Sequence, residues 1–163
     1  MEQAEPMEQV VAYNQLLKEM DKLYHLAAVQ SGLSDTSFWI LYSVCERAEA
    51  YTQKELCDAW SYSPQTVNSS LKGLKESGFV QLVPSPTSHK NKQIVLTPAG
   101  KELIQKIIFP LMEAEKNAFS SLAPDEQALF LTLTKKHLNG LKKEIHQLFH
   151  TSSEDCASQC TKL

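Results

Sequence analysis

The sequence lacks a long apolar run, a secretory signal and enough cysteines for a disulfide scaffold. No apolar stretch approaches the roughly 18 residues that a membrane-spanning helix needs. The first nine residues, MEQAEPMEQ, are acidic and polar, unlike a signal peptide. The chain has only four cysteines, and two of them lie in the polar segment SSEDCASQCTKL. We therefore expect a soluble cytoplasmic protein without a membrane partner. Cys45 and Cys57 read as buried thiols, and a role in sensing oxidants stays open.

Motifs that mark enzymes are missing as well. The five histidines are scattered, and no G-x-S-x-G, H-E-x-x-H or phosphate-binding glycine loop accompanies them. His146 and His150 are spaced like two metal ligands, but two histidines near a fraying helix end are more often solvated. The sequence therefore predicts neither catalysis nor a metal nor a cofactor.

The formal net charge of −3 argues against an indiscriminate binder of polyanions. Residues 52–97, however, contain five lysines and three acidic residues, which gives this segment a net charge of +2. A locally basic segment in an acidic chain is compatible with a selective nucleic-acid binder, although +2 is a weak signal.

The order of periodic segments predicts a mostly helical fold with a small β-hairpin. Apolar residues recur at helical spacing over residues 10–29, 34–48 and 52–60, and again from 63 to the glycine at 78. Two short β-branched runs follow at 79–83 and 93–97. A further helix begins at Thr97 and Pro98, with a kink or split expected near Pro110, and the last helix begins at Pro124.

The segment 63–80, SPQTVNSSLKGLKESGFV, predicts a helix with two distinct faces. Ser63 can cap it, Pro64 suits its first position, and Gly78 can take the left-handed conformation that ends it. A stripe to be buried is formed by Val67, Leu71 and Leu74. At about 100° per residue, the opposite side carries Gln65, Ser69 and Lys72.

This helix and its neighbours have the order of a winged helix-turn-helix. The short helix at 52–60, which opens on a capping box of Thr52 and Glu55, is joined to it by the link SYS. The two predicted strands enclose the polar stretch PSPTSHKNK. We expect this stretch to be a loop whose tip carries His89, Lys90, Asn91 and Lys92.

The ordered pattern T-x-x-E-L, S-P-x-T-V, L-x-x-L-x-x-x-G-F-V and V-x-L-T-P-A-G resembles the MarR family of bacterial regulators. It is carried by Thr52, Glu55, Leu56, Ser63, Pro64, Thr66, Val67, Leu71, Leu74, Gly78, Phe79, Val80, Val95, Leu96, Thr97, Pro98, Ala99 and Gly100. The resemblance implies a homodimer that binds double-stranded DNA at a pseudo-palindromic operator, usually as a repressor that a small, often phenolic, ligand or an oxidant releases.

The resemblance also implies a division of the chain. Residues 1–33 and 101–150 would form a helical dimerisation region, and residues 34–100 would form the winged helix-turn-helix. The polar residues 151–163 are expected to be a disordered tail.

The sequence departs from the family pattern at two places where side chains would contact DNA bases. Where the family's wing often holds Asp-x-Arg, this chain has Ser88, His89 and Lys90. Lysine is a poorer minor-groove probe than arginine, because it is more hydrated and lacks a planar fork. Asn68 and Ser69 lie where the family's recognition helix often has an arginine, so base preference cannot be taken from relatives.

The candidate DNA-binding residues come from the helix and the wing: Ser63, Gln65, Thr66, Asn68, Ser69, Lys72, His89, Lys90 and Lys92. Each could instead be an ordinary exposed polar side chain. The alternative function is a winged-helix module that binds proteins, although such an interface favours aromatic anchors over this polar face.

A small aromatic effector would need a wall of apolar rings. The resemblance places such a pocket beside Tyr13, Tyr24, Phe38, Trp39 and Tyr42. Aromatic residues at helical spacing are more often plain core, and that reading competes with the pocket.

Overall fold

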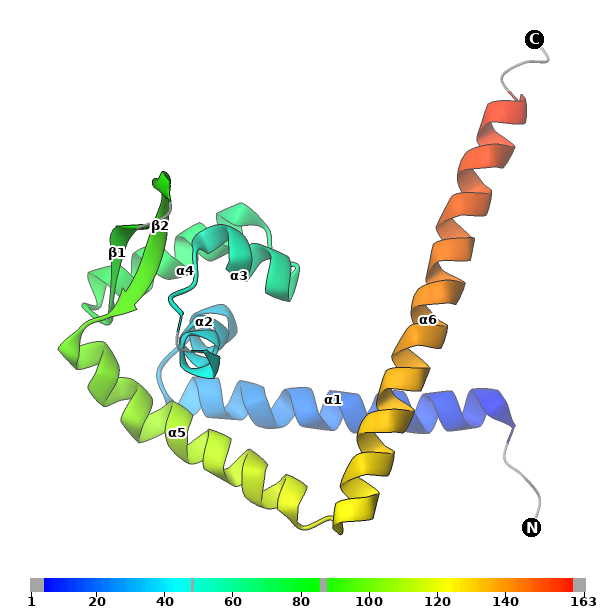
Figure 1. The fold of residues 1–163 in the computed structure, drawn as a ribbon, viewed down its shortest axis with the longest axis horizontal. Helices are drawn as coiled ribbons and strands as arrows, with labels where there is room; N and C mark the ends of the chain where they lie inside the picture. The colour runs from blue at the N-terminus through cyan, green and yellow to red at the C-terminus, as the bar shows by residue number, and fades with distance from the viewer. Residues whose placement is uncertain (1–4, 48, 86–87, 160–163) are drawn as a thin grey trace. The chain divides into compact units, whose positions relative to one another are not determined.

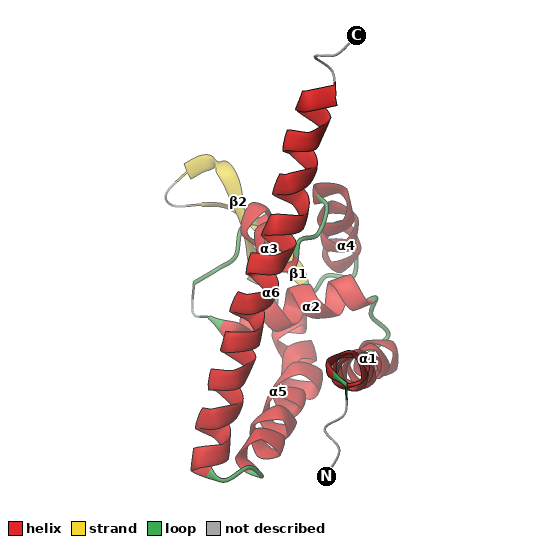
Figure 2. Cartoon of the chain, turned by 90° about the vertical axis from the view of Figure 1, so that its right-hand side faces the viewer, coloured by secondary structure: helices red, strands yellow, loops and turns green. Residues whose placement is uncertain are grey.

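The computed structural model describes residues 5–47, 49–85 and 88–159, and the side chains within these ranges except at 88–91 and 150–159. The described chain consists of helices and one two-stranded antiparallel sheet (Figures 1 and 2). The elements are α1 (Pro6–Gln30), α2 (Asp35–Glu46), α3 (Gln53–Trp60), α4 (Pro64–Glu76), β1 (Val80–Ser85), β2 (Ser88–Leu96), α5 (Pro98–Ser120) and α6 (Pro124–Gln159). The predicted fold class is confirmed.

The chain divides into two compact units that meet inside α5. The first, Met1–Met112, contains the hairpin and every helix up to the first part of α5, and the second, Glu113–Leu163, contains the rest. The core of the first unit is formed by Ala28, Phe38, Ile40, Leu41, Leu56, Val67, Leu71, Leu74, Val80, Ile94, Ile104 and Ile108. None of the helices in the described ranges is long and apolar enough to cross a membrane.

Two of the predicted helix starts are built as expected. The hydroxyl of Ser34 accepts the backbone N–H of Ser37 at 3.2 Å and caps α2. At α3 the capping box is complete, because the N–H of Thr52 donates to the Glu55 carboxylate at 2.7 Å while the Thr52 hydroxyl accepts the N–H of Glu55 at 3.3 Å. Both devices satisfy backbone donors that a helix leaves open at its first turn.

The end of the hairpin is tied to the start of α5. The N–H of Thr97 donates to the carbonyl of Phe79 at 3.0 Å, and its hydroxyl donates to the carbonyl of Gly78 at 2.5 Å. The same hydroxyl accepts the N–H of Gly100 at 3.0 Å. A Cβ on Gly100 would overlap the carbonyl oxygen of Phe79, so only glycine fits this close approach. These contacts give a structural reason for the T-P-A-G motif.

Three helix bounds differ from the sequence-based expectation. Helix α1 begins at Pro6, ahead of residue 10, since proline is well accommodated in a first turn. Helix α5 passes through Pro110 without being split. Helix α6 continues to Gln159, into the segment expected to be a disordered tail, because no glycine or proline follows Gly140 to end it. The last residues of that expected tail, 160–163, lie outside the described residues.

Candidate nucleic-acid interface

Helix α4 is defined at both ends by its own sequence. The hydroxyl of Ser63 accepts the N–H of Thr66 at 3.1 Å, and Pro64 occupies the first turn. At the other end, Gly78 has φ of +75°. The N–H groups of Gly78 and Phe79 return to carbonyls in the last turn at 3.0 and 2.9 Å. This is the Schellman arrangement, in which a left-handed residue closes the helix and satisfies its last carbonyls.

The two faces of α4 are separated as the sequence predicts. Val67, Leu71 and Leu74 are all buried in the core of the first unit. The candidate DNA-reading residues of this helix are all exposed: Ser63, Gln65, Thr66, Asn68, Ser69 and Lys72. The structure therefore brings them onto one solvent-facing surface, which we call the α4 face. Its use in binding DNA stays a prediction.

Two of these residues are engaged with each other, and a third has a weak local partner. The hydroxyl oxygens of Ser63 and Thr66 lie 2.8 Å apart, so both belong to the capping of α4. The Lys72 ammonium lies 3.9 Å from the Glu76 carboxylate one turn on, and both side chains are largely exposed. An exposed pair at this distance contributes little, so Lys72 can exchange Glu76 for a phosphate.

The prediction that the polar stretch of the wing forms a loop is wrong in one respect. His89, Lys90, Asn91 and Lys92 lie within strand β2 rather than in a loop. The pairing is regular from Val80 opposite Leu96 to Pro84 opposite Lys92. It then shifts, because Ser85 pairs with Ser88 and leaves residues 89–91 as extra residues on one strand.

The polar composition of this stretch hides its strand character, since cross-strand hydrogen bonds need only backbone groups. Of the wing's candidate residues, Lys92 is exposed. The side chains of His89 and Lys90 lie outside the described set.

The wing is anchored to the segment before α3, which the sequence did not single out. The N–H of Ile94 donates to the carbonyl of Tyr51 at 2.8 Å, and Thr52 forms a single antiparallel bridge with Gln93. The guanidinium of Arg47 lies 3.5 Å from the ring centroid of Tyr51. Only the Thr52–Glu55 capping pattern could have signalled this junction.

The carboxylate of Glu55 belongs to the same junction. The backbone N–H of Thr52 and the guanidinium of Arg47, 2.8 Å away, lower the pKa of Glu55 to about 2. The hydrogen bond that Arg47 donates to the Glu55 carboxylate in turn raises the pKa of Arg47. This ion pair joins the residue after α2 to the first turn of α3, and Glu55 keeps its charge down to well below its ordinary pKa.

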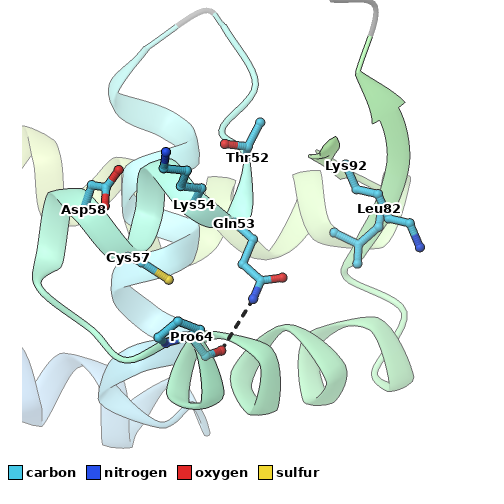
Figure 3. Close-up of a pocket in the computed structure, with 8 residues that line it drawn as sticks. All are labelled: Thr52, Gln53, Lys54, Cys57, Asp58, Pro64, Leu82 and Lys92. Carbon is cyan, nitrogen blue, oxygen red and sulfur yellow. Dashed lines mark hydrogen bonds between the residues drawn. The ribbon is translucent and has the colours of Figure 1, made fainter. Parts of the chain in front are cut away.

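A cavity of about 430 Å³ opens between α3, the first turn of α4 and the hairpin (Figure 3). It is lined by Thr52, Gln53, Lys54, Cys57, Asp58, Pro64, Leu82 and Lys92. The amide of Gln53 donates to the carbonyl of Pro64 at 3.4 Å and so connects the first residues of the two helices, as the dashed line in Figure 3 shows. Two ammonium groups on this rim add positive charge beside the α4 face, partly offset by Asp58.

The structure brings together only some of the aromatic residues predicted to line an effector pocket. The Trp39 ring lies 4.9 Å from Tyr24, 5.6 Å from Phe38 and 5.3 Å from Tyr42, measured between ring centroids. Phe38 is fully buried. Tyr13 lies three helical turns before Tyr24 on α1 and is exposed.

Trp60 and Tyr62 join this aromatic cluster, although the sequence analysis did not place them there. They come from the end of α3 and the link after it. No helical periodicity signals such a contact. The small-molecule pocket itself stays a prediction.

The two internal cysteines differ in environment. Burial, and next to it the charge of Glu46, raises the pKa of the Cys45 thiol to about 11. The thiol donates to the carbonyl of Leu41 at 3.2 Å. A thiol held in its protonated form is a poor nucleophile, which argues against oxidant sensing at Cys45. Cys57 is half-buried and faces the cavity beside the wing.

No group of three or more His, Cys, Asp and Glu side chains in the described ranges could hold a metal ion.

Part of this chain matches a model of a known protein family. A model of the MarR family matches residues 31–90, from the end of α1 into β2. No curated protein sequence matches closely enough to count as a relative.

Three solved structures are similar in fold. A MarR family regulator from Neisseria meningitidis is 18% identical with a TM-score of 0.70, over 85% of this chain and 97% of the other. The S. aureus MepR–DNA complex is 19% identical with a TM-score of 0.64, over 80% and 96%. A Listeria monocytogenes regulator complexed with 26mer DNA, described as a putative MarR family member, is 18% identical with a TM-score of 0.65, over 83% and 89%. Together with the motif residues in α3, α4 and the wing, these matches show a winged helix-turn-helix fold and a similarity of residues 31–90 to the MarR family.

Proposed function

We propose that this protein is a sequence-specific DNA-binding transcriptional regulator that represses from a pseudo-palindromic operator as a homodimer. The observation that carries the proposal is the α4 face: an exposed polar surface on a helix whose other side is fixed in the core, next to a hairpin that carries Lys92. Two of the similar solved structures, from S. aureus and Listeria monocytogenes, are complexes with DNA, which supports the same proposal. A bacterial cytoplasm, where such DNA is accessible, is the compartment that this proposal implies.

The residues of the α4 face have the chemistry of base and phosphate contacts. The amide of Gln65 matches the donor and acceptor edge of adenine in the major groove. Thr66 can offer a methyl group to thymine, while its hydroxyl stays with Ser63. The exposed first turn of α4 can hold a phosphate through backbone N–H groups. Asn68, Ser69 and Lys72 follow along the groove, so phosphate contacts outnumber the contacts that read sequence.

The proposed dimer would bury apolar side chains that α1 and α6 leave exposed. On α1, Leu16, Met20 and Leu23 are 60%, 51% and 67% exposed. On α6, Leu131, Leu138, Leu141, Ile145 and Leu148 are all more than 40% exposed. Exposed apolar stripes of this length are costly in water and are typical of interfaces between subunits. Twofold symmetry would place two α4 faces on half-sites about one helical turn apart.

A test of DNA binding is footprinting of the DNA upstream of the protein's own gene and its neighbours, at moderate salt. We expect protection of a site with twofold symmetry. The affinity for that site is then measured against salt concentration for Lys92→Ala and for Lys106→Ala, an exposed lysine on α5 that serves as the control. Losing one phosphate contact should weaken binding and flatten the slope of log K against log salt by about 1 for Lys92→Ala only.

If Lys92→Ala leaves both affinity and slope unchanged, the wing does not contact DNA. If no protected site exists at all, the protein-interaction module replaces the regulator as the favoured function.

Release by a small aromatic effector or an oxidant is the finer part of the proposal. The rings of Tyr24, Trp39 and Tyr42 would supply the apolar wall, and the raised pKa of Cys45 makes Cys57 the better thiol for oxidation. A thermal-shift screen with small aromatic acids and with peroxide tests both routes. No change in melting temperature with any compound would remove the sensing role.

A further inference from the structure

The turn between α3 and α4 contains a residue in an unfavourable backbone conformation. Ser61 has φ of 53° and ψ of 31°, the left-handed region, and it is the only non-glycine residue in the described ranges with a positive φ. A residue other than glycine stays in this left-handed region only where the surrounding structure fixes its backbone conformation. The structure around Ser61 must therefore hold this turn in place.

The residues on either side of Ser61 supply that hold. The rings of Trp60 and Tyr62 are nearly parallel, at 17°, with centroids 6.3 Å apart. Trp60 also packs against Trp39 of α2, at 4.7 Å between centroids. Its indole N–H donates at 2.7 Å to the hydroxyl of Ser43, which donates at 2.8 Å to the carbonyl of Trp39. The turn is thus attached to α2 by ring contacts and by a hydrogen-bond chain that passes through the buried hydroxyl of Ser43.

The same cluster extends to α1. The ring of Tyr24 lies 4.9 Å from Trp39, at an angle of 51°. The next residue, His25, places its ring nitrogen 2.9 Å from the carboxylate of Asp35, the first residue of α2. Burial, with a smaller contribution from the charge of Asp35, raises the pKa of Tyr62, so this carboxylate is also near the turn. Tyr24 therefore connects α1 to the turn before α4 through the rings of Trp39 and Trp60, and His25 connects α1 to the start of α2.

The connection ends at the cap of α4. Tyr62 immediately precedes Ser63, whose hydroxyl fixes the first turn of α4. The other end of this connection is Tyr24 on α1. Within one turn of Tyr24, the side chains of Met20 and Leu23 are more than half exposed. A change in what covers this part of α1 would therefore act on Tyr24 first.

We propose that Tyr24, Trp39, Trp60 and Tyr62 form a positioning relay, through which the placement of α1 against α2 sets the orientation of the first turn of α4. This inference rests on the proposed function only in giving α4 the role of reading DNA. The relay itself is a statement about coupling within one subunit. It makes these four residues positioning residues, none of which needs to touch DNA.

Ordinary core packing is the competing explanation for these ring contacts. A relay and plain core packing differ in which segments become less stable when one ring is removed. Removing a ring from plain core weakens the whole unit, so all its segments open more often. Removing a ring from a relay loosens the first turn of α4 selectively, although Tyr24 lies on another helix.

The first experiment measures amide hydrogen exchange on the full-length protein for Tyr24→Leu and Tyr24→Phe. The leucine variant removes the ring, whereas the phenylalanine variant keeps it. We expect the amides of Thr66 and Val67 to exchange at least about threefold faster in Tyr24→Leu, with the wing amide of Ile94 unchanged and near-wild-type rates in Tyr24→Phe. Unchanged exchange in α4, or equal acceleration at Ile94, would overturn the relay.

The second experiment uses the tryptophans, because the chain has only two and both belong to the relay. Their 4.7 Å separation should produce coupled indole bands in the near-ultraviolet circular dichroism spectrum, lost in Trp60→Phe. Tyr24→Leu should change this signal, whereas Phe119→Leu, an aromatic removal in the second unit, should leave it intact. An identical spectrum in Tyr24→Leu would contradict the coupling.

Neither measurement needs DNA, so both give an answer even if no operator is found. Where footprinting has identified a site, Tyr24→Leu should bind that DNA more weakly than Tyr24→Phe. Equal binding by the two variants would show that the turn is not positioned from α1.

Discussion

Replacing Gly100 with alanine is the sharpest test of how the wing is attached to the rest of the winged helix-turn-helix. The new Cβ would overlap the carbonyl oxygen of Phe79 and lie 3.3 Å from the side chain of Leu96. The first of these neighbours is backbone, so it cannot rotate away. Either the start of α5 or the end of the α4–β1 connection must move, which breaks the bonds that Thr97 makes to Gly78 and Phe79.

The size of the effect follows from opposing contributions. Alanine in place of glycine in a helix gains about 1 kcal/mol in propensity. Overpacking at a rigid site costs about 1–3 kcal/mol, and each lost hydrogen bond costs about 1 kcal/mol more. With both Thr97 bonds lost, we expect Gly100→Ala to lower the free energy of unfolding by about 2–4 kcal/mol.

The matched control is Gly73→Ala in α4, where an added Cβ meets nothing within 4 Å. That variant should be more stable than wild type by about 0.5–1 kcal/mol. The same chemical change therefore has opposite signs at two helical positions of one unit.

Urea unfolding, followed by far-ultraviolet circular dichroism, measures both variants. The protein concentration must be the same throughout, because self-association raises apparent stability. With a slope of about 2 kcal/mol per molar urea, the two midpoints should differ by about 1 M or more. A Gly100→Ala midpoint equal to or above that of Gly73→Ala would refute the close-approach argument.

Other expectations follow from the core and from the titrating groups. Leu71→Ala should lower the free energy of unfolding by about 2–5 kcal/mol, measured by urea unfolding, since Leu71 is 2% exposed in the core. Glu55→Gln should lower it by about 1 kcal/mol at pH 7, a value reduced because the Glu55 side chain is 45% exposed. The bond from the N–H of Thr52 helps lower the pKa of Glu55 from 4.5 to about 2, so this contribution is complete above pH 4.5 and fades as the pH falls towards 2. The deficit of Glu55→Gln should therefore shrink between pH 7 and pH 3, and a constant deficit would contradict the assignment. Cys45, with its pKa raised to about 11, should react with iodoacetamide far more slowly in the native protein than in urea.

The helices, their caps and the α4 face could be predicted because each depends on residues within a turn or two of one another. Ser63, Pro64 and Gly78 act on backbone groups three to five residues away, and the stripe of Val67 and Leu71 follows from helical spacing. The wing was predicted less well. A polar stretch that reads as a loop is extended in β2, because its strand conformation comes from pairing with β1 rather than from its own side chains.

The exposed residues of the candidate site could be predicted from the sequence, but the residues that hold the wing in place could not. The exposed polar residues of α4 could be named from the sequence, whereas Arg47 and Tyr51 could not, since nothing local connects them to Ile94 some forty residues on. The contacts of Trp39 with Tyr24, Phe38 and Tyr42 could not be read from helical spacing, because it does not tell which faces of α1 and α2 meet. The place of Tyr13 in an effector wall stays a prediction.

The sequence by itself determined which segments become helices, how α3 and α4 are capped, and which side of α4 is apolar, since these follow from interactions within about four residues along the chain. Only the tertiary structure decided that Ser61 adopts a left-handed conformation, that Trp39 meets both Tyr24 and Trp60, and that Gly100 lies against the carbonyl of Phe79. Those features depend on contacts between residues far apart along the chain. Such contacts exist only once the helices and the hairpin have packed around one core.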